Sequence, residues 1–148
     1  MKKILKENNK EQIIKEIIKK ALLGKKNNAT IISLSGDLGA GKTTITKEIA
    51  KQLGIKENVV SPTFVIMKIY KLESNSKHYS NFKKLIHIDA YRIEDAKEFI
   101  NFDWEEIISD KENLVVLEWP EKIKKIIPKN AINISLSHID EETRQIEF

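Results

Sequence analysis

The sequence contains no cysteine, and it has only five glycines and three prolines among its 148 residues. Without cysteine, a disulfide framework and a thiolate zinc site are both excluded. The longest apolar runs extend over only a few residues, whereas a membrane-spanning helix needs about 20. Residues 1–10 lack the apolar core of a secretory signal. We therefore expect a cytoplasmic protein without a membrane-spanning segment.

A strong excess of one charge is also missing. The net charge is +4, and the lysines are scattered along the chain, often beside an acid, as in Lys15-Glu16 and Lys47-Glu48. This pattern is more typical of a solvated surface than of a nucleic-acid-binding patch. The hydrophobic fraction of 41% is ordinary for a folded protein. We expect a single domain over residues 1–148, with one core.

Apolar residues at helical spacing predict a first helix that ends near Leu22, with Asn8 or Asn9 as its N-cap and Gly24 beyond its C-terminus. Further helical patterns cover residues 45–53, 94–108 and 121–127, and Pro128 stops the last of them. The pattern at 94–108 is consistent with one or two short helices.

Short runs rich in β-branched and aromatic residues predict strands. They cover residues 30–34, 64–72, 85–89, 114–118, 132–136 and 143–148, and the polar residues 73–81 predict a loop. Strands that alternate with helices indicate an α/β fold with a mainly parallel central sheet flanked by helices. The two closing strands suggest that the sheet is antiparallel toward the C-terminus.

The segment between the strand at 30–34 and the helix at 45–53 matches the P-loop pattern G-x-x-x-x-G-K-[ST]. Glycines in this loop let backbone amides turn inward around phosphate oxygens, and the following helix directs its positive end at them. Lys42 is expected to reach the β- and γ-phosphates, and the Thr43 hydroxyl to bind magnesium. The predicted ATP-binding residues are Gly36, Asp37, Leu38, Gly39, Ala40, Gly41, Lys42, Thr43 and Thr44.

Two carboxylates follow apolar strands, as a P-loop site requires for its metal or water ligands. Asp89 comes after Leu85–Ile88, and Glu118 comes after Leu114–Leu117. Each strand delivers its acid to the carboxyl edge of the sheet, where such folds bind ligands. His87 would share a side of its strand with Asp89, so it is either a packed, hydrogen-bonded histidine or a residue that positions Asp89.

Ser61, Pro62 and Thr63 lie between the P-loop helix and the next strand. A loop at this place can approach the γ-phosphate and change conformation when that phosphate is lost. An ordinary Ser-Pro turn is an equally good interpretation. Similarly, Trp119 can be a packing residue.

Taken in order, these segments resemble the TsaE family of bacterial proteins. The matching segments are Gly36–Thr44, Ser61-Pro62-Thr63-Phe64, His87-Ile88-Asp89-Ala90-Tyr91-Arg92 and Glu118-Trp119-Pro120-Glu121. The resemblance implies a P-loop ATPase required for the threonylcarbamoyl group on N6 of adenosine 37 in tRNAs that read codons beginning with A. It further implies slow turnover alone, activation by the partners TsaD and TsaB, and contact with tRNA only through that complex.

The resemblance also implies roles for single residues. Lys42 and Asp89 would be catalytic, and Thr43 and Glu118 would bind magnesium. Glu11 and Arg144 are candidates for adenine contacts, and Trp119 is a further candidate without an assigned role.

Three other functions share the P-loop. A small-molecule or nucleoside kinase usually has an arginine-bearing lid, and here arginine occurs only at Arg92 and Arg144. A GTPase needs an N-K-x-D element for guanine, and the sequence has none. A nucleotide-dependent binding module would differ from the ATPase mainly in whether turnover matters.

Overall fold

The computed structural model describes residues 1–23, 27–73 and 81–148. Within these ranges the strands form one seven-stranded sheet in the order β1-β7-β6-β2-β5-β4-β3. The strands are β1 (Lys2–Leu5), β2 (Thr30–Ser35), β3 (Met67–Lys71), β4 (Lys84–Asp89), β5 (Asn113–Glu118), β6 (Ile132–His138) and β7 (Arg144–Glu147).

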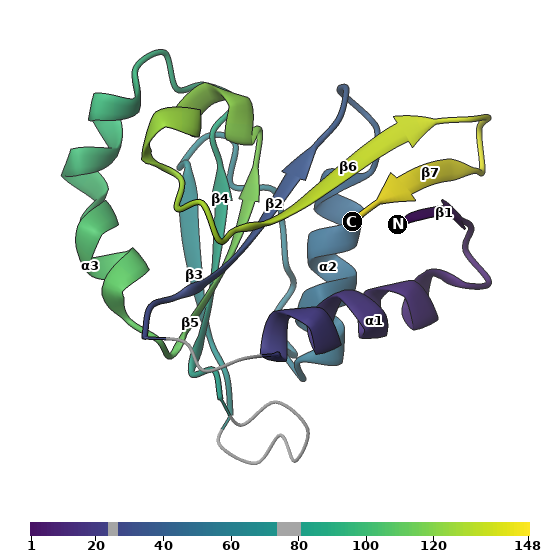
Figure 1. Ribbon diagram of the computed structural model, residues 1–148, viewed down its shortest axis with the longest axis horizontal. Coiled ribbons are helices and arrows are strands. Elements are labelled where there is room, and N and C mark those ends of the chain that lie inside the picture. The colour runs from purple at the N-terminus through teal and green to yellow at the C-terminus, as the bar shows by residue number, and fades with distance from the viewer. Residues whose placement is uncertain (24–26, 74–80) are drawn as a thin grey trace.

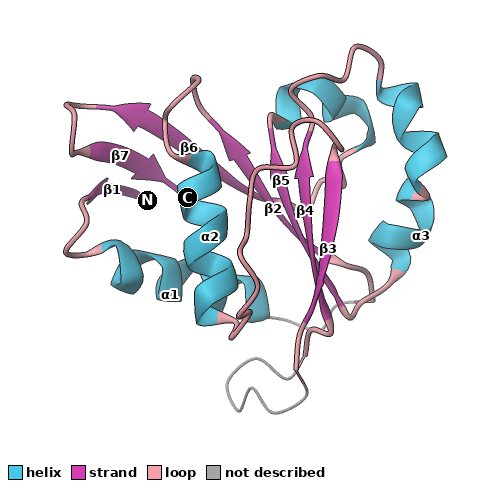
Figure 2. Ribbon diagram, turned by 180° about the vertical axis from the view of Figure 1, so that it is seen from behind, coloured by secondary structure: helices cyan, strands magenta, loops and turns pink. Residues whose placement is uncertain are grey.

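Helices cover both faces of the sheet (Figures 1 and 2). On one face lie α1 (Lys10–Leu22) and α2 (Lys42–Gln52), whose apolar side chains share a buried cluster with β2, β4, β5 and β6. On the other face a second cluster joins the sheet to η1 (Ala96–Phe102), α3 (Trp104–Ser109) and η2 (Pro120–Ile126). η1 and η2 are 3₁₀-helices.

The central strands are buried on both faces, as their continuous apolar runs require. All six residues of β5 are buried, and Ile32 and Leu34 of β2 have no solvent exposure. Each such side chain stabilises the fold by about 1.5–3 kcal/mol relative to an exposed position. The sheet is therefore most deeply buried at β2, β5 and β4, the strands whose carboxyl ends carry the predicted site.

The α/β fold with a sheet between helices is confirmed, and the sheet is mixed. β2 pairs in parallel with β5 and β6, and β4 pairs in parallel with β5. The predicted antiparallel pair at the C-terminus is present as β6 and β7. Antiparallel strands also lie at both edges, where β1 pairs with β7 and β3 pairs with β4.

Two features differ from the sequence predictions. β1 was not predicted, because four residues with two lysines carry no strand pattern and the strand forms only by pairing with β7. The strand predicted at 64–72 is shorter, since Val65 and Ile66 both donate backbone hydrogen bonds to the Pro62 carbonyl and Ile66 has φ +67°. This turn keeps residues 64–66 out of β3, although the Ile66 carbonyl oxygen still accepts a hydrogen bond from the Asp89 amide of β4 at 2.8 Å.

The helix predictions are confirmed in place: the pattern at 94–108 forms two short helices, Ala96–Phe102 and Trp104–Ser109, that meet at Asp103. The pattern at 121–127 forms η2, which is interrupted by non-helical backbone angles at Ile123. Asn9 occupies the N-cap position of α1, but its side chain bonds to the backbone of Ile4 and Lys6 instead of capping the helix. Gly24 and residues 74–80 of the predicted loop lie outside the described residues.

Candidate functional site

The loop between β2 and α2 has a backbone that only glycine adopts readily. Gly36 has φ +140°, and a Cβ at this position would lie 2.4 Å from the carbonyl oxygen of Leu136 on β6. Gly41 has φ +101° and is the N-cap of α2. The first amides of α2 have no partner within the helix, so this end of the helix is suited to an anion.

Lys42 is the first residue of α2, and its side chain folds back over this loop. Its Nζ atom donates hydrogen bonds to the carbonyl oxygens of Gly36 at 2.5 Å and Asp37 at 2.9 Å. The same nitrogen lies 3.9 Å from the centre of the Trp119 ring. Burial lowers the pKa of Lys42, and neighbouring carboxylates, Glu118 first among them, oppose that shift.

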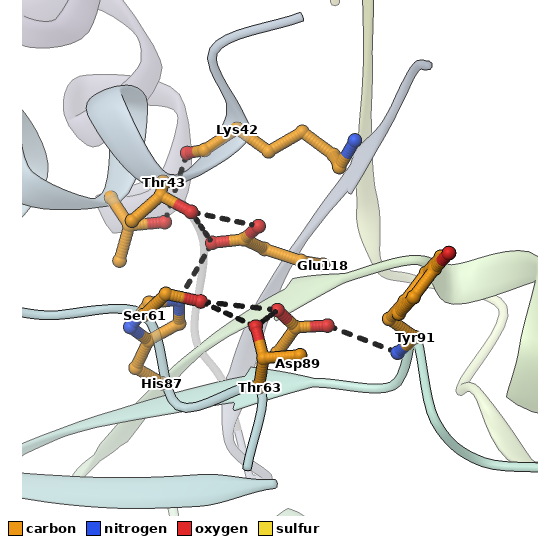
Figure 3. A network of polar contacts seen from close by, with 9 residues as sticks. Lys42, Thr43, Ser61, Thr63, His87, Asp89, Tyr91 and Glu118 are labelled. Atoms are coloured by element: carbon orange, nitrogen blue, oxygen red, sulfur yellow. Dashed lines mark hydrogen bonds and ion pairs between the residues drawn. The ribbon is translucent and has the colours of Figure 1, made fainter. Parts of the chain in front are cut away.

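Glu118, at the end of β5, is buried with two hydrogen-bonding partners (Figure 3). The Thr43 hydroxyl lies 3.0 Å from its Oε1 atom and 3.2 Å from its Oε2 atom. His87 Nε2 lies 2.7 Å from Oε1. The hypothesis that His87 positions Asp89 therefore named the wrong carboxylate, and the alternative of a packed, hydrogen-bonded histidine is confirmed.

Asp89 ends β4 and lies beside Glu118 in the parallel ladder. Its Oδ2 atom accepts hydrogen bonds from Thr63 at 2.8 Å and from Ser61 at 3.3 Å, and its Oδ1 atom accepts one from the Tyr91 amide at 3.0 Å. The two hydroxyl groups lie 2.7 Å apart. The segment predicted to sense phosphate is thus tied to the carboxylate predicted to assist hydrolysis (Figure 3).

These groups line one cavity of about 340 Å³. Most of the residues predicted for the site are brought together here. The lining residues are Leu38, Gly39, Gly41, Lys42, Thr43, Thr44, Ser61, Thr63, Asp89, Tyr91, Glu118 and Trp119. The tilted pair of Tyr91 and Trp119, with ring centres 5.0 Å apart, forms an aromatic part of the wall.

A second cavity of about 580 Å³ lies on the other side of the P-loop. It is lined by residues 5–8 and Lys10 and by residues 141–144 of the β6–β7 turn region, and it shares Gly41 and Thr44 with the first cavity. No pattern in the sequence predicts this cavity. It depends on the unpredicted β1, which brings the N-terminal segment beside β7 (Figure 1).

The structure separates the two candidates for adenine contacts. Arg144 lines the second cavity, and its guanidinium Nη1 also donates to the backbone oxygens of Asp140 and Glu141. Glu11 instead pairs with Lys15 at 3.0 Å on the exposed side of α1. Arg144 therefore remains a candidate on geometry, whereas the Glu11 side chain is engaged elsewhere.

A divalent cation would find few protein ligands here. Among the described residues, no group of three or more histidine and acidic side chains could hold a metal ion. One hydroxyl and one carboxylate, from Thr43 and Glu118, meet beside the loop predicted to bind phosphate. This donor set fits Mg²⁺, which commonly takes one or two protein ligands and completes its octahedron with phosphate oxygens and water.

Comparisons with known proteins agree with one another. The family model described as threonylcarbamoyl adenosine biosynthesis protein TsaE matches residues 6–146. A Rickettsia felis protein named tRNA threonylcarbamoyladenosine biosynthesis protein TsaE is 36% identical over 92% of this chain and 74% of its own length. A Bacillus subtilis protein of the same name is 36% identical over 80% of this chain and 68% of its own.

The fold has a counterpart among solved structures. The crystal structure of Bacillus subtilis YdiB superposes with a TM-score of 0.69 and 27% identity, over 99% of this chain and 82% of that one.

None of the helices in the described part of the chain is both long and apolar enough to span a membrane.

Proposed function

This chain belongs to the TsaE family, and from that premise we propose that it is a magnesium-dependent ATPase required for the threonylcarbamoyl modification of adenosine 37 in tRNA. It would act in the cytoplasm with the partner proteins TsaD and TsaB. The observation that carries the ATPase proposal is the contact of Thr43 with Glu118 beside a glycine loop that ends at a helix N-terminus.

The phosphates of ATP would bind in the cavity over the P-loop. The amides that precede and begin α2 would donate to phosphate oxygens, and Lys42 would exchange its two backbone carbonyl partners for phosphate. Both are interactions with an anion of high charge. They explain why Lys42 is kept in a buried position although burial disfavours its charge.

Thr43 and Glu118 would hold Mg²⁺, which, when bound, neutralises charge on the phosphates. Asp89 would orient the attacking water, because its carboxylate lies next to Glu118 in the ladder and lines the same cavity. Ser61 and Thr63 donate to Asp89. Loss of the γ-phosphate would therefore change the conformation of residues 61–63 through their hydrogen bonds to Asp89. This supports the assignment of residues 61–63 as a switch.

The second cavity is the proposed site of the adenine base. It shares Gly41 and Thr44 with the phosphate cavity, so one nucleotide can extend from one cavity into the other over the P-loop. Arg144 lies in its wall. In this proposal the loop that precedes α1, and not the side chain of Glu11, contacts the adenine base.

A kinase with an arginine-bearing lid is disfavoured by where the arginines lie. Arg92 stacks on the ring of Phe64, with its Cζ atom 4.5 Å from the ring centre. Arg144 is held by the backbone of the β6–β7 turn region. Neither arginine lines the phosphate cavity.

Depletion of the protein in its own organism tests the pathway. We expect threonylcarbamoyladenosine in tRNA to fall, and to recover with the wild-type gene but not with Lys42→Ala. Normal levels after depletion would refute the role in tRNA modification.

A second experiment tests the partners. Purified protein is expected to hydrolyse ATP slowly in the presence of magnesium and faster when TsaB and TsaD are added. Rapid phosphorylation of a nucleoside by the isolated chain would instead support a kinase.

A further inference from the structure

His87 is a buried polar side chain that the proposed function leaves without a role. It lies on β4 with no solvent exposure, and its Nε2 atom is 2.7 Å from Glu118 Oε1. In the described part of the chain, its Nδ1 atom has no hydrogen-bonding partner. A hydrogen on Nε2 can therefore be donated to Glu118, whereas a hydrogen on Nδ1 would be a buried N–H group without a described partner.

Glu118 needs such a donor because its carboxylate is only 2% exposed. A buried carboxylate is costly unless donors replace the water it has lost. Its donors come from two directions: His87 reaches Oε1, while the Thr43 hydroxyl lies between 3.0 and 3.2 Å from both oxygens. Together they restrict rotation of a side chain that is otherwise free to turn at its end.

We propose that His87 is a positioning residue, whose Nε2–H group holds the Glu118 carboxylate turned toward Thr43 and the phosphate cavity in the orientation that binds magnesium. The proposal rests on the proposed function, in which Glu118 is a magnesium ligand. His87 does not line the cavity, so it would act only through Glu118. Partners of this kind, behind a metal ligand, typically change metal affinity by about 10- to 100-fold when removed.

The neighbouring residues of β4 argue against a role in packing alone. Leu85, Ile86 and Ile88 are apolar and almost completely buried, and an apolar residue at position 87 would extend the same core. Such a residue would leave Glu118 with Thr43 as its one remaining side-chain donor among those described. That arrangement would permit the carboxylate to rotate away from the cavity.

The test compares His87→Gln, whose side-chain amide can still donate at the place of Nε2, with His87→Phe, which fills a similar volume without a donor. Ile86→Val controls for a small loss of packing, because Ile86 faces the opposite cluster. The affinity for a fluorescent ADP is measured with magnesium and with EDTA. For each variant the ratio of the two affinities gives the gain due to the metal, and thermal unfolding checks the fold.

We expect the ratio of the affinity with magnesium to the affinity in EDTA to be about tenfold or more smaller for His87→Phe than for the wild type. The affinity of His87→Phe in EDTA should be unchanged. His87→Gln and Ile86→Val should keep most of the gain. The proposal is overturned if His87→Phe retains the wild-type gain, or if His87→Gln loses it as fully as His87→Phe. Absence of any magnesium gain in the wild-type chain would refute the proposed function itself.

An independent measurement uses the wild-type chain, with His87→Gln only to assign the signal, so it stands even if His87→Phe does not fold. Long-range proton–nitrogen correlation spectra of histidine-labelled protein report which ring nitrogen carries the hydrogen. We expect the Nε2–H pattern for His87, assigned by its disappearance in His87→Gln. An Nδ1–H pattern would overturn the proposal, because Nε2 could then not donate to Glu118.

Discussion

The hydroxyl of Thr43 lies 3.0 Å from the carboxylate of Glu118, although 75 residues separate them in the sequence. Thr43 stands in the first turn of α2, and Glu118 is the last residue of β5, which pairs with β2. The contact joins the loop predicted to bind phosphate to the carboxyl edge of the sheet. A metal site can form at this place because both elements are anchored in the same buried core.

Lys42→Ala should weaken ATP binding, since it removes a charged donor from the phosphates. A hydrogen bond to a charged group is worth about 1.5–3 kcal/mol, which corresponds to roughly a 10- to 150-fold loss of affinity. Titration calorimetry measures it, with Lys47→Ala on the exposed side of α2 as the control. Equal affinities of the two variants would place the phosphates elsewhere.

Glu118→Gln and Asp89→Asn should separate metal binding from hydrolysis. Glu118→Gln is expected to reduce the dependence of nucleotide binding on magnesium, because a neutral amide is a weaker ligand for this hard cation. Asp89→Asn should leave that dependence intact and lower hydrolysis by about a hundredfold or more. Binding and turnover are measured over a magnesium series, and the reverse pattern would exchange the two roles.

Thr63→Ala should slow hydrolysis more than Ser61→Ala does. Thr63 donates to Asp89 at 2.8 Å, whereas Ser61 lies at 3.3 Å. Loss of one such bond costs about 1 kcal/mol, or roughly a fivefold effect on rate. Thr63→Ser keeps the hydroxyl and is the matched control, so a defect as large as that of Thr63→Ala would show that the hydroxyl is not the cause.

Gly36→Ala should destabilise the fold, because its Cβ would lie 2.4 Å from a backbone oxygen of β6. Gly54→Ala is the control: it also has positive φ, at +83°, but its Cβ would meet no atom within 4 Å. We expect the free energy of unfolding to fall by about 1–2 kcal/mol in Gly54→Ala, from backbone strain alone, and by about 3 kcal/mol or more in Gly36→Ala. Urea denaturation measures both values. Equal losses of unfolding free energy would mean that the backbone of β6 shifts to make room for the new methyl group.

As the pH is raised, nucleotide affinity in EDTA should begin to fall at a lower pH than it would if the phosphate-binding lysine had its usual pKa. Burial lowers the pKa of Lys42 in the free protein, and only its charged form attracts phosphate. Affinity should therefore be constant below that lowered pKa and decrease as the pH rises through it. Lys42→Ala should lack this dependence, and the same decline in that variant would assign it to another group.

Much of the fold was predictable because its signals are local. The strand ending at Glu118 is a continuous apolar run, and the one ending at Asp89 is apolar except for His87; such segments indicate buried strands whatever their partners are. The shortened strand at 64–72 shows the limit of this reasoning. Its residue types favour a strand, but the hydrogen bonds to the Pro62 carbonyl compete successfully with the ladder.

In the site, the sequence by itself determined the phosphate loop. Glycine at positions 36 and 41, a lysine and a hydroxyl residue at the start of a helix specify a local backbone and its charge, which need no distant partner to be recognised. The presence of two acids at strand ends was determined in the same way.

Only the tertiary structure decided which side chains meet. Strand order places β4 beside β5, so Asp89 lies next to Glu118, and His87 contacts Glu118 rather than the acid two residues along its own strand. Likewise, β1 creates the second cavity by pairing with β7 at the opposite end of the chain. Such contacts depend on long-range packing, for which a residue pattern along one segment carries no signal.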